Sequence, residues 1–410
     1  MRTSDDRKSI LFVHNNNDLY GAEVVLLELI RGLDRTLFKP MVVLPADVRH
    51  INRLSAKLQE EGIPFRFIRM GVIRRRYFGP LGIIRFALNC LTGVATLVWI
   101  ALSHRIDIIH SNTVSVPCGA IAAKLLRRPH IWHVHEMVTR PAVARRIVHR
   151  FVTRMSTVVV AVSNAVKNHI LEDCPGQAEK IRVILNGIDV DRFAESTENS
   201  AIRQQFGISE QDCLVGMVGK VCRWKGQLLL VEAARLVCAL RPDISFLAVG
   251  GVFDDERYYM DAFRDAVVQS GLESRFRISD YSSDVRPFLR AFDIFVLPST
   301  EPDPFPTVVL EAMASGRPVV ASGHGGPIEM IVEGETGLLF TPGSAESLAS
   351  AVLSLSGNMA HSREMGRNGQ KRAVQFFTSG RYVQEFGSLY SELAHQAKGV
   401  EATRAELSSE

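Results

Sequence analysis

Short apolar runs alternate with amphipathic stretches along the whole chain. In the first half, runs of strand length cover residues 9–14, 41–44, 65–70, 106–110, 130–135 and 157–162. Residues 22–32 and 51–61, which lie between them, have the spacing of apolar positions that is typical of a helix. Buried strands that alternate with helices predict a parallel α/β sheet.

The same alternation restarts after Gly187. Apolar runs cover residues 214–218, 245–249, 276–278, 293–298 and 318–321, and helices are predicted to begin at Gln227 and Glu256. We therefore predict two doubly wound, Rossmann-like α/β domains, residues 1–188 and 189–375, with the polar residues 196–200 as linker. Residues 376–398 are expected to form a helix that returns to the first domain, and 399–410 a disordered tail. Ligands bind beyond the carboxyl ends of such sheets, so an interdomain cleft is expected.

Composition narrows the class of protein. Of the 410 residues, 46% are apolar and 22% are charged, which excludes disordered, collagen-like and coiled-coil chains. The cysteines Cys90, Cys118, Cys174, Cys213, Cys222 and Cys238 form no C-x-x-C pair. This spacing argues against a disulfide framework or a thiolate zinc site, and it favours a reducing compartment. Because the first nine residues are polar, no secretory signal is expected, and we predict a cytoplasmic protein.

The net charge of +4 conceals an uneven distribution. Residues 1–198 hold 28 Lys and Arg against 18 Asp and Glu, and residues 66–154 hold 15 against 2. A basic half attracts an anionic partner such as a phosphate, a nucleic acid or a lipid surface. The chain has no RRM, KH or helix-turn-helix signature, so we predict no nucleic-acid partner.

Residues 86–102 form the longest apolar stretch. It has 17 residues with Asn89, Thr92 and Thr96 inside it, fewer than the roughly 20 apolar residues that a membrane span needs. We therefore reject a transmembrane helix and favour a buried helix of the first domain. An alternative leaves the stretch partly exposed on an anionic membrane surface, to which the chain would bind peripherally. The arginines that precede it support this alternative: Arg74, Arg75, Arg76 and Arg85.

Gly21 follows the first strand at the predicted start of a helix. The free N–H groups and the dipole of a helix start favour an anion there, a simple tight turn is the alternative, and the signal alone is weak. The loop lacks the G-x-G-x-x-G fingerprint, which counts against a nicotinamide or flavin dinucleotide.

A glycine-rich and cationic segment ends the first strand of the second domain. Gly219 and Gly226 allow the backbone to approach a ligand, and Lys220, Arg223 and Lys225 supply three cations within six residues. This combination suits a diphosphate, and solvated surface cations are the alternative. The segment is not a Walker P-loop, because the G-x-x-x-x-G-K-[ST] order is absent.

Residues 299–318 are the richest stretch for chemistry. A strand runs into an acidic, proline-stiffened loop that carries Asp303, and a helix that opens near Pro306 carries Glu311. Carboxylates accept hydrogen bonds from vicinal hydroxyls such as those of sugars and ribose. The free N–H groups at the helix start can bind phosphate.

Histidines follow two strands of the first domain. His133, His135 and Glu136 are ligand-type residues, but no third distant ligand is evident, so a core or sugar contact is favoured over a metal. His110 and Asn112 end another strand and either contact an acceptor or satisfy the strand end. Asp189-Val-Asp191 has the form of a manganese-binding D-x-D motif, but we interpret it as structural.

These motifs together resemble glycosyltransferase family 4, a group of retaining enzymes with the GT-B fold. The similar segments cover nearly the whole chain in the family's order, and those of the second half are the more specific. They are Tyr20-Gly-Ala-Glu23, His133-Val-His-Glu136, Asn186-Gly-Ile-Asp189, Gly219-Lys220 with Lys225-Gly226, Asp303-x7-Glu311, Gly325-Gly-Pro-Ile-Glu329 and residues 386–390.

The resemblance implies a role for each matching residue. Lys220 and Lys225 would contact the donor diphosphate, Glu311 the donor ribose, and Asp303 and His135 the transferred sugar. Other implied donor contacts are Gly21, Gly219, Arg223, Pro304, Phe305, Pro306 and Thr307. The implied acceptor-side residues are His110, Asn112, His133 and Glu136. No metal or other cofactor is expected, because lysines and helix N-termini can neutralise the departing diphosphate.

The implied reaction is retaining transfer of a sugar from a nucleotide diphosphate sugar to a polysaccharide, lipopolysaccharide or lipid-linked acceptor. Three residues depart from the family's pattern: Lys220 replaces an arginine, Asp303 a glutamate and Pro306 a glycine. These departures bear on the identity of the donor more than on activity. Two alternatives stay open: a non-catalytic nucleotide-sugar-binding relative, and another GT-B enzyme such as an epimerase or a phosphorylase.

Overall fold

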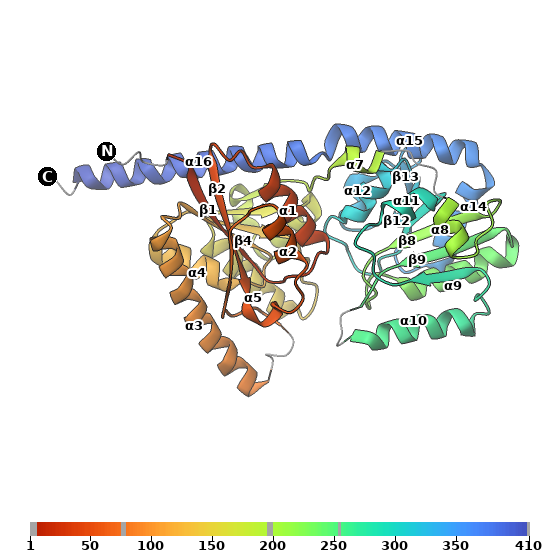
Figure 1. The fold of residues 1–410 in the computed structure, drawn as a ribbon, viewed down its shortest axis with the longest axis horizontal. Helices are drawn as coiled ribbons and strands as arrows, with labels where there is room; N and C mark the ends of the chain where they lie inside the picture. Colours follow the sequence, from red (N-terminus) through yellow and green to blue (C-terminus); the bar gives the residue numbers. More distant parts are fainter. Residues whose placement is uncertain (1–5, 75–78, 195–199, 253–255, 408–410) are drawn as a thin grey trace. The chain divides into compact units, whose positions relative to one another are not determined.

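The computed structural model describes residues 6–74, 79–194, 200–252 and 256–407 (Figure 1). The chain forms two compact units. One comprises Met1–Asn186 with Ser379–Glu410, and the other comprises Gly187–Thr378. The boundaries proposed from the sequence, 188/189 and 375/376, lie close to these. Arg75, Arg76 and residues 196–199 of the proposed linker lie outside the described residues.

The N-terminal unit contains a seven-stranded parallel sheet. Its strand order is β3-β2-β1-β4-β5-β6-β7, so the order reverses between β1 and β4. The strands are β1 (Lys8–His14), β2 (Phe38–Pro45), β3 (Phe65–Ile68), β4 (Ile108–Asn112), β5 (His130–Val134), β6 (Val158–Ala161) and β7 (Ile181–Val183). The sequence analysis missed β7, because three residues with an exposed centre have no clear strand pattern.

Helices cover both faces of this sheet, as the alternation of apolar runs and helices predicted. Ile10 and Phe12 of β1 belong to the core under α1 and α16, and Leu11 and Val13 belong to the core under α3 and α4. Because successive strand residues point to opposite faces, a continuous apolar run is what a doubly covered strand needs. The helices are α1 (Gly21–Gly32), α2 (Leu54–Glu60), α3 (Pro80–Ser103), α4 (Pro117–Leu126), α5 (Ala142–Met155), α6 (Asn164–Asp173) and α16 (Ser379–Leu407), with 3-10 turns η1 (Ala46–Val48) and η3 (Pro175–Lys180).

The last helix, α16, belongs to the N-terminal unit. Tyr382, Phe386 and Tyr390 are fully buried there beside Phe12 and His110. The helix continues to Leu407, so the expectation of a disordered tail from residue 399 is wrong for residues 399–407. Alanine, glutamate, arginine and leucine dominate this stretch, and all four have high helix propensity.

The C-terminal unit contains a six-stranded parallel sheet in the order β10-β9-β8-β11-β12-β13, reversing between β8 and β11. The strands are β8 (Cys213–Val218), β9 (Ile244–Val249), β10 (Phe276–Ser279), β11 (Ile294–Leu297), β12 (Val319–Ser322) and β13 (Gly337–Phe340). The helices are α7 (Val190–Ala194), α8 (Ser200–Gln205), α9 (Gln227–Leu240), α10 (Arg257–Gln269), α11 (Arg286–Ala291), α12 (Thr307–Ala314), α13 (Pro327–Met330), α14 (Ala345–Gly357) and α15 (Met359–Phe376). Each unit is thus doubly wound, as predicted.

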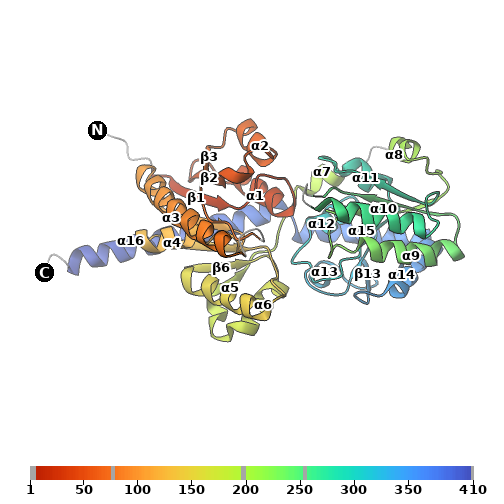
Figure 2. The ribbon, with the colours of Figure 1, turned by 90° about the horizontal axis from the view of Figure 1, so that it is seen from below.

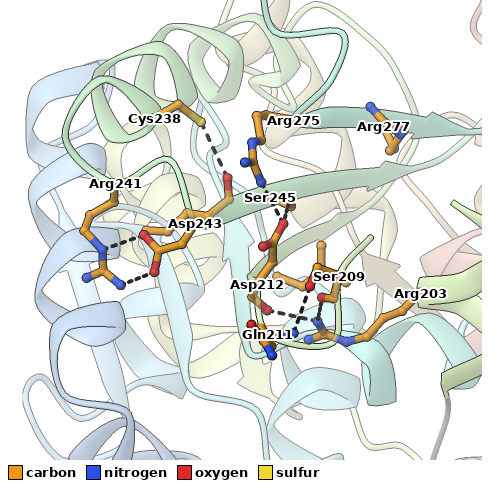
Figure 3. Close-up of polar contacts among 12 residues, drawn as sticks. Arg203, Ser209, Gln211, Asp212, Cys238, Arg241, Asp243, Ser245, Arg275 and Arg277 are labelled. Atoms are coloured by element: carbon orange, nitrogen blue, oxygen red, sulfur yellow. Dashed lines mark hydrogen bonds and ion pairs between the residues drawn. The ribbon is translucent and has the colours of Figure 1, made fainter. Parts of the chain in front are cut away.

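A polar network closes the amino-terminal edge of this second sheet (Figure 3). The carboxylate of Asp212 accepts hydrogen bonds from the Ser245 hydroxyl at 2.7 Å and from Arg275 Nη1 at 2.8 Å. Arg203 on α8 donates to the backbone carbonyls of Ser209 and Asp212. This network fixes the edge away from the carboxyl ends, where a ligand is expected.

Helix α3 corrects the interpretation of the apolar stretch. It spans 24 residues rather than 17, lies beside α4 (Figure 2), and has all of its fully buried residues in its second half. Its buried residues are Gly93, Leu97, Ile100 and Ala101. The favoured expectation of a buried helix is therefore wrong for its first half. By length and composition alone, this helix could cross a membrane. The six cysteines are all free.

Candidate functional site

The site residues of the C-terminal unit gather where the strand order reverses. Residues 219–226 follow β8, and residues 298–306 follow the neighbouring strand β11. Ligands bind at this position in open parallel sheets, because the loops from the two halves of the sheet diverge there. Two segments about 80 residues apart in the sequence therefore meet at one edge of the sheet.

Two ion pairs join these segments. Lys225 Nζ contacts the carboxylate of Asp303, and Arg223 contacts the carboxylate of Glu301. The backbone N–H of Thr300 donates to the carbonyl of Trp224 at 2.8 Å, and Lys225 Nζ lies 4.4 Å from the centre of the Trp224 ring. The predicted cation and carboxylate are thus direct neighbours.

Lys220 has a different partner. Its Nζ lies 2.8 Å from Glu256 Oε2, at the start of α10. Gln227 Nε2 donates to the Lys220 carbonyl at 2.9 Å, which fixes the backbone of the loop. Gly226 has a φ of +83°, and a Cβ there would lie 1.8 Å from the carbonyl oxygen of Pro298. Only glycine fits at this crossing of the two segments.

The backbone around Asp303 is held by the glycines of the Gly-Gly-Pro segment. The N–H of Gly326 donates to the Asp303 carbonyl at 2.7 Å, and a Cβ at Gly325 would lie 2.4 Å from the same oxygen. The N-cap of α12 is Pro306, so Asp303 does not cap this helix. The carboxylate of Asp303 is therefore held by tertiary contacts.

Glu311 lies in the middle of α12 with only 7% of its surface exposed. Burial raises the pKa of Glu311 to about 7, although the Thr307 hydroxyl and the charge of Arg192 act to lower it. A buried carboxyl group with one neutral hydroxyl partner is poised to accept further hydrogen bonds, because its charged form lacks solvation.

The loop before α12 differs in part from its predicted role. The ring of Phe305 is buried and packs edge-on against Phe377 at 5.8 Å, and Pro306 is buried as well. The resemblance implied donor contacts for the four residues from Pro304 to Thr307. The side chain of Phe305, one of these four, anchors the loop instead. No side chain caps the start of α12, and the N–H groups of a helix start can bind an anion.

In the N-terminal unit, four side chains form a continuous chain of hydrogen bonds at the reversal point. His135 Nε2 lies 2.8 Å from Asn112 Oδ1, and Asn112 Nδ2 lies 3.0 Å from His14 Nδ1. His14 Nε2 lies 2.8 Å from Glu23 Oε1, and Glu23 Oε2 accepts the N–H of Tyr20 at 3.0 Å. His14 and Asn112 end β1 and β4, and Glu23 lies in the first turn of α1, which begins at the exposed Gly21.

Two groups in this region have shifted pKa values. Burial is the main cause that lowers the pKa of His135 to about 3, with the neighbouring His14 ring as a second cause, so its imidazole is neutral near pH 7. Burial raises the pKa of Glu136 to about 7. Glu136 Oε2 accepts the backbone N–H groups of Val114 and His135, both at 3.1 Å. Glu136 therefore fixes the loop that carries His135.

Three predicted acceptor-side residues are in the interior. His110 and His133 are 0% exposed and pack against Phe386 of α16, and His110 Nδ1 lies 2.7 Å from the Tyr390 hydroxyl. Asn112 is also 0% exposed. Their assignment to the acceptor is corrected: strand alternation turns these side chains under α16 or into the hydrogen-bonded chain. Within the described ranges, no group of three or more His, Cys, Asp or Glu has a metal-binding arrangement.

Sequence reasoning missed four partners of the predicted residues. Glu23 was part of a recognised motif, and His14 ended a predicted strand. Both residues were thus indicated by the sequence, but no role was predicted for either. Glu301 was visible in the acidic loop. Glu256 pairs with Lys220 across more than 30 positions, and no local pattern indicates such a pair. Asp189 accepts the N–H of Arg192 at 3.3 Å, which fits its structural interpretation.

Comparisons with known proteins place the chain in a family. Residues 20–192 match the model described as Glycosyltransferase Family 4, and residues 198–372 match that of Glycosyl transferases group 1. The UDP-Gal:alpha-D-GlcNAc-diphosphoundecaprenol alpha-1,3-galactosyltransferase of Escherichia coli is 24% identical over 91% of this chain and 96% of its own. The alpha-maltose-1-phosphate synthase of Mycolicibacterium smegmatis is 28% identical over 70% and 79%.

Solved structures agree with this assignment. The crystal structure of Anabaena HepE in complex with UDP-glucose superimposes with a TM-score of 0.81 at 28% identity, covering 94% of this chain and 99% of that one. The match spans both doubly wound units, as the GT-B fold requires. The chain therefore belongs to the family 4, group 1 glycosyltransferases and is a transferase enzyme.

Proposed function

We propose that this enzyme transfers a sugar, with retention at the anomeric carbon, from a nucleotide diphosphate sugar to an envelope glycan or lipid-linked acceptor. The observation that carries the proposal is the pairing of Lys225 with Asp303 at the β8–β11 reversal, beside Lys220 and the helix that carries Glu311. A cation for the diphosphate and a carboxylate for hydroxyls thus lie side by side. The UDP-glucose complex of HepE, at 28% identity, supports this class of donor.

In the proposed mechanism, Lys220 and Lys225 neutralise the charge that develops on the departing diphosphate. The uncapped start of α12 adds backbone N–H donors to the same charge. Glu311 accepts the ribose hydroxyls, and Asp303 accepts hydroxyls of the transferred sugar. We assign no metal to the reaction, because these cations supply the neutralisation.

Retention follows if both bonds change on one face of the sugar. The acceptor oxygen bonds to the anomeric carbon as the bond from that carbon to the phosphate oxygen breaks. The leaving phosphate oxygen takes the proton of the acceptor hydroxyl. No carboxylate is assigned as a covalent nucleophile in this scheme, which leaves Asp303 free to orient the sugar.

The acceptor is proposed to be lipid-linked or part of a surface polysaccharide. The E. coli relative, 24% identical, is named for a diphosphoundecaprenol acceptor. The basic window of residues 66–154 suits an acceptor that carries phosphate or lies at an anionic surface.

We further propose that the enzyme is cytoplasmic and binds the inner membrane surface through α3. An apolar stripe with helical spacing runs along the exposed side of this helix: Leu81, Ile84, Leu88, Leu91, Trp99 and Leu102. Leu81 is 83% exposed and Leu91 is 69% exposed. Arg85 lies exposed beside the stripe, and the guanidinium of Arg66 lies 5.7 Å from the centre of the Trp99 ring. Apolar residues flanked by cations fit an anionic bilayer.

This helix is proposed to lie on the bilayer rather than to cross it. The strands on either side of it, β3 before and β4 after, belong to one sheet. A crossing would require the chain to return through the bilayer between residues 69 and 79. Eleven residues are too few for a membrane-spanning helix, which needs about 20, and the bilayer interior demands paired backbone groups.

The test is a screen of nucleotide diphosphate sugars against the full chain. A bound donor should raise the melting temperature by an amount that grows with the logarithm of its concentration above Kd, since ligands stabilise the folded state by mass action. The stabilising donor is then incubated with lipid-linked and soluble glycan acceptors, and the anomeric configuration of the product is read by NMR. Inversion of the anomeric carbon would contradict the retaining mechanism. Absence of stabilisation, transfer and hydrolysis with every donor would contradict the proposed function.

A further inference from the structure

We propose that Glu23 sets the tautomer of His135 from a distance, through His14 and Asn112. This chain of four side chains, called the relay below, joins α1, β1, β4 and the loop after β5. Glu23, His14 and Asn112 are positioning residues in this scheme. His135 is the only one of the four that is partly exposed. The relay ends in a ring nitrogen that accepts a hydrogen bond.

Glu23 sets the direction of the hydrogen bonds in the relay, that is, which atom of each pair donates and which accepts. The hydrogen bond from His14 and the N–H of Tyr20 keep the pKa of Glu23 below its ordinary value, even though burial acts to raise it. As a carboxylate, Glu23 only accepts hydrogen bonds. Its Oε2 accepts the Tyr20 N–H at 3.0 Å, and its Oε1 faces His14 Nε2 at 2.8 Å. His14 must therefore carry a proton on Nε2.

Asn112 transmits this polarity. Its Nδ2 faces His14 Nδ1 at 3.0 Å and the carbonyl oxygen of Ala22 at 3.5 Å. Both neighbours accept when the Nδ1 of His14 is bare, and both amide hydrogens are then used. A flipped amide would turn its oxygen toward the Ala22 carbonyl, which repels it. The amide therefore presents Oδ1 to His135.

The last step fixes His135. Because Asn112 Oδ1 only accepts, His135 Nε2 at 2.8 Å must donate. His135 is neutral near pH 7, so its Nδ1 keeps a lone pair. Within the described part of the chain, no side chain or backbone group forms a hydrogen bond with this Nδ1. The next step rests on the proposed function. Nδ1 accepts a hydrogen bond from a hydroxyl of the transferred sugar, and the reversed tautomer would point an N–H group at that hydroxyl instead.

The variant Glu23→Gln is designed to reverse the direction of each hydrogen bond in the relay. The glutamine oxygen must face the Tyr20 N–H, so its amide NH₂ faces His14 Nε2. His14 then carries its proton on Nδ1, Asn112 flips, and His135 Nδ1 becomes protonated. The matched control is Glu136→Gln, because Glu136 is also next to His135 but accepts from the backbone N–H groups of Val114 and His135 and from the Thr113 side chain, not from a side chain of the relay.

The experiment labels the histidine ring nitrogens with ¹⁵N and reads the tautomers of the full chain by two-bond proton–nitrogen correlation. His135→Asn and His14→Asn assign the two signals. In the wild type, both rings should be protonated at Nε2, and Glu136→Gln should leave them so. Glu23→Gln should move both protons to Nδ1. A wild-type His135 protonated at Nδ1, or a folded Glu23→Gln with His135 unchanged, would overturn the proposal.

The wild-type spectrum decides the matter even if Glu23→Gln fails to fold. A second readout tests the link to function. Glu23→Gln should weaken nucleotide-sugar binding by about tenfold, the cost of one opposed hydrogen bond, while binding of the free nucleotide diphosphate stays unchanged. Equal loss of both ligands would contradict the link to the sugar. If no nucleotide sugar binds the wild type, the proposed function fails while the tautomer result stands.

Discussion

Lys225 and Asp303 form an ion pair although 78 positions separate them in the sequence. Both side chains are largely buried, with 15% and 6% of their surfaces exposed. A pair so shielded from water holds its geometry better than an exposed one, where solvent screens the attraction. Lys225, proposed to contact the diphosphate, thus forms an ion pair with Asp303, proposed to contact the sugar. Donor binding must therefore break this ion pair, so that Lys225 can contact the diphosphate and Asp303 can contact the sugar.

The first prediction concerns Asp303. Asp303→Asn should lower turnover and affinity for the nucleotide sugar. A carboxylate accepts hydrogen bonds from hydroxyls on two oxygens, whereas the amide accepts on its one oxygen only. Affinity for the nucleotide diphosphate should stay the same or rise, since Lys225 loses a competing carboxylate. Asp303→Glu should be tolerated best. Titration calorimetry with both ligands measures these affinities, and Asp261→Asn on the exposed side of α10 is the control. Full transfer activity in Asp303→Asn would remove Asp303 from the site.

The second prediction concerns Lys220. Lys220→Ala should reduce kcat by about 10²-fold, the usual effect of deleting a donor that stabilises developing charge, whereas Lys220→Arg should retain most activity. Transfer by the wild type should persist in EDTA, because the lysines act in place of a divalent cation. Lys371→Ala removes an exposed charge of the same unit and serves as control. Loss of activity in EDTA with recovery in manganese would refute the proposed role of the lysines.

The third prediction concerns α3. The full chain should sediment with vesicles that contain anionic lipid, and binding should fall as salt rises, because ions screen the attraction. Leu88→Asp combined with Leu91→Asp should abolish binding without loss of stability, since both side chains are exposed. Leu240→Asp, on an exposed position of α9, should bind like the wild type. Equal binding to neutral vesicles would be inconsistent with the proposal.

Local patterns predicted the two sheets and the loops after β8 and β11, because buried strands and glycine-rich turns leave a signature in neighbouring residues. They did not predict that His110 and His133 lie under α16. That outcome depends on Phe386 and Tyr390, which arrive from the far end of the chain. The exposure of α3 was predicted only as an alternative for the same reason: an apolar run is equally compatible with a core and with a lipid surface until its neighbours are known.

The last prediction concerns Glu311, whose pKa burial raises from its ordinary 4.5 to about 7. Between these values the folded protein keeps a proton that the unfolded chain has released. The free energy of unfolding therefore falls as pH rises through this window, and above it the ionised carboxylate is a constant cost. Glu311→Gln is neutral throughout. Without ligand, its stability advantage over the wild type should be near zero at pH 4.5 and should grow to at most about 3 kcal/mol above pH 8.

A nucleotide diphosphate should narrow or cancel this stability advantage at high pH. If ribose hydroxyls donate to Glu311, they stabilise its charged form, and the wild type should gain more in melting temperature than Glu311→Gln does. The expected difference is about 1.5–3 kcal/mol for a charge-assisted hydrogen bond. Thermal unfolding of both proteins across this pH range, with and without ligand, measures the two effects. Glu364→Gln, exposed on α15, should show neither. A pH-dependent stability gain in Glu311→Gln without any loss of nucleotide diphosphate affinity would mean that Glu311 is buried and shifted but does not touch the donor.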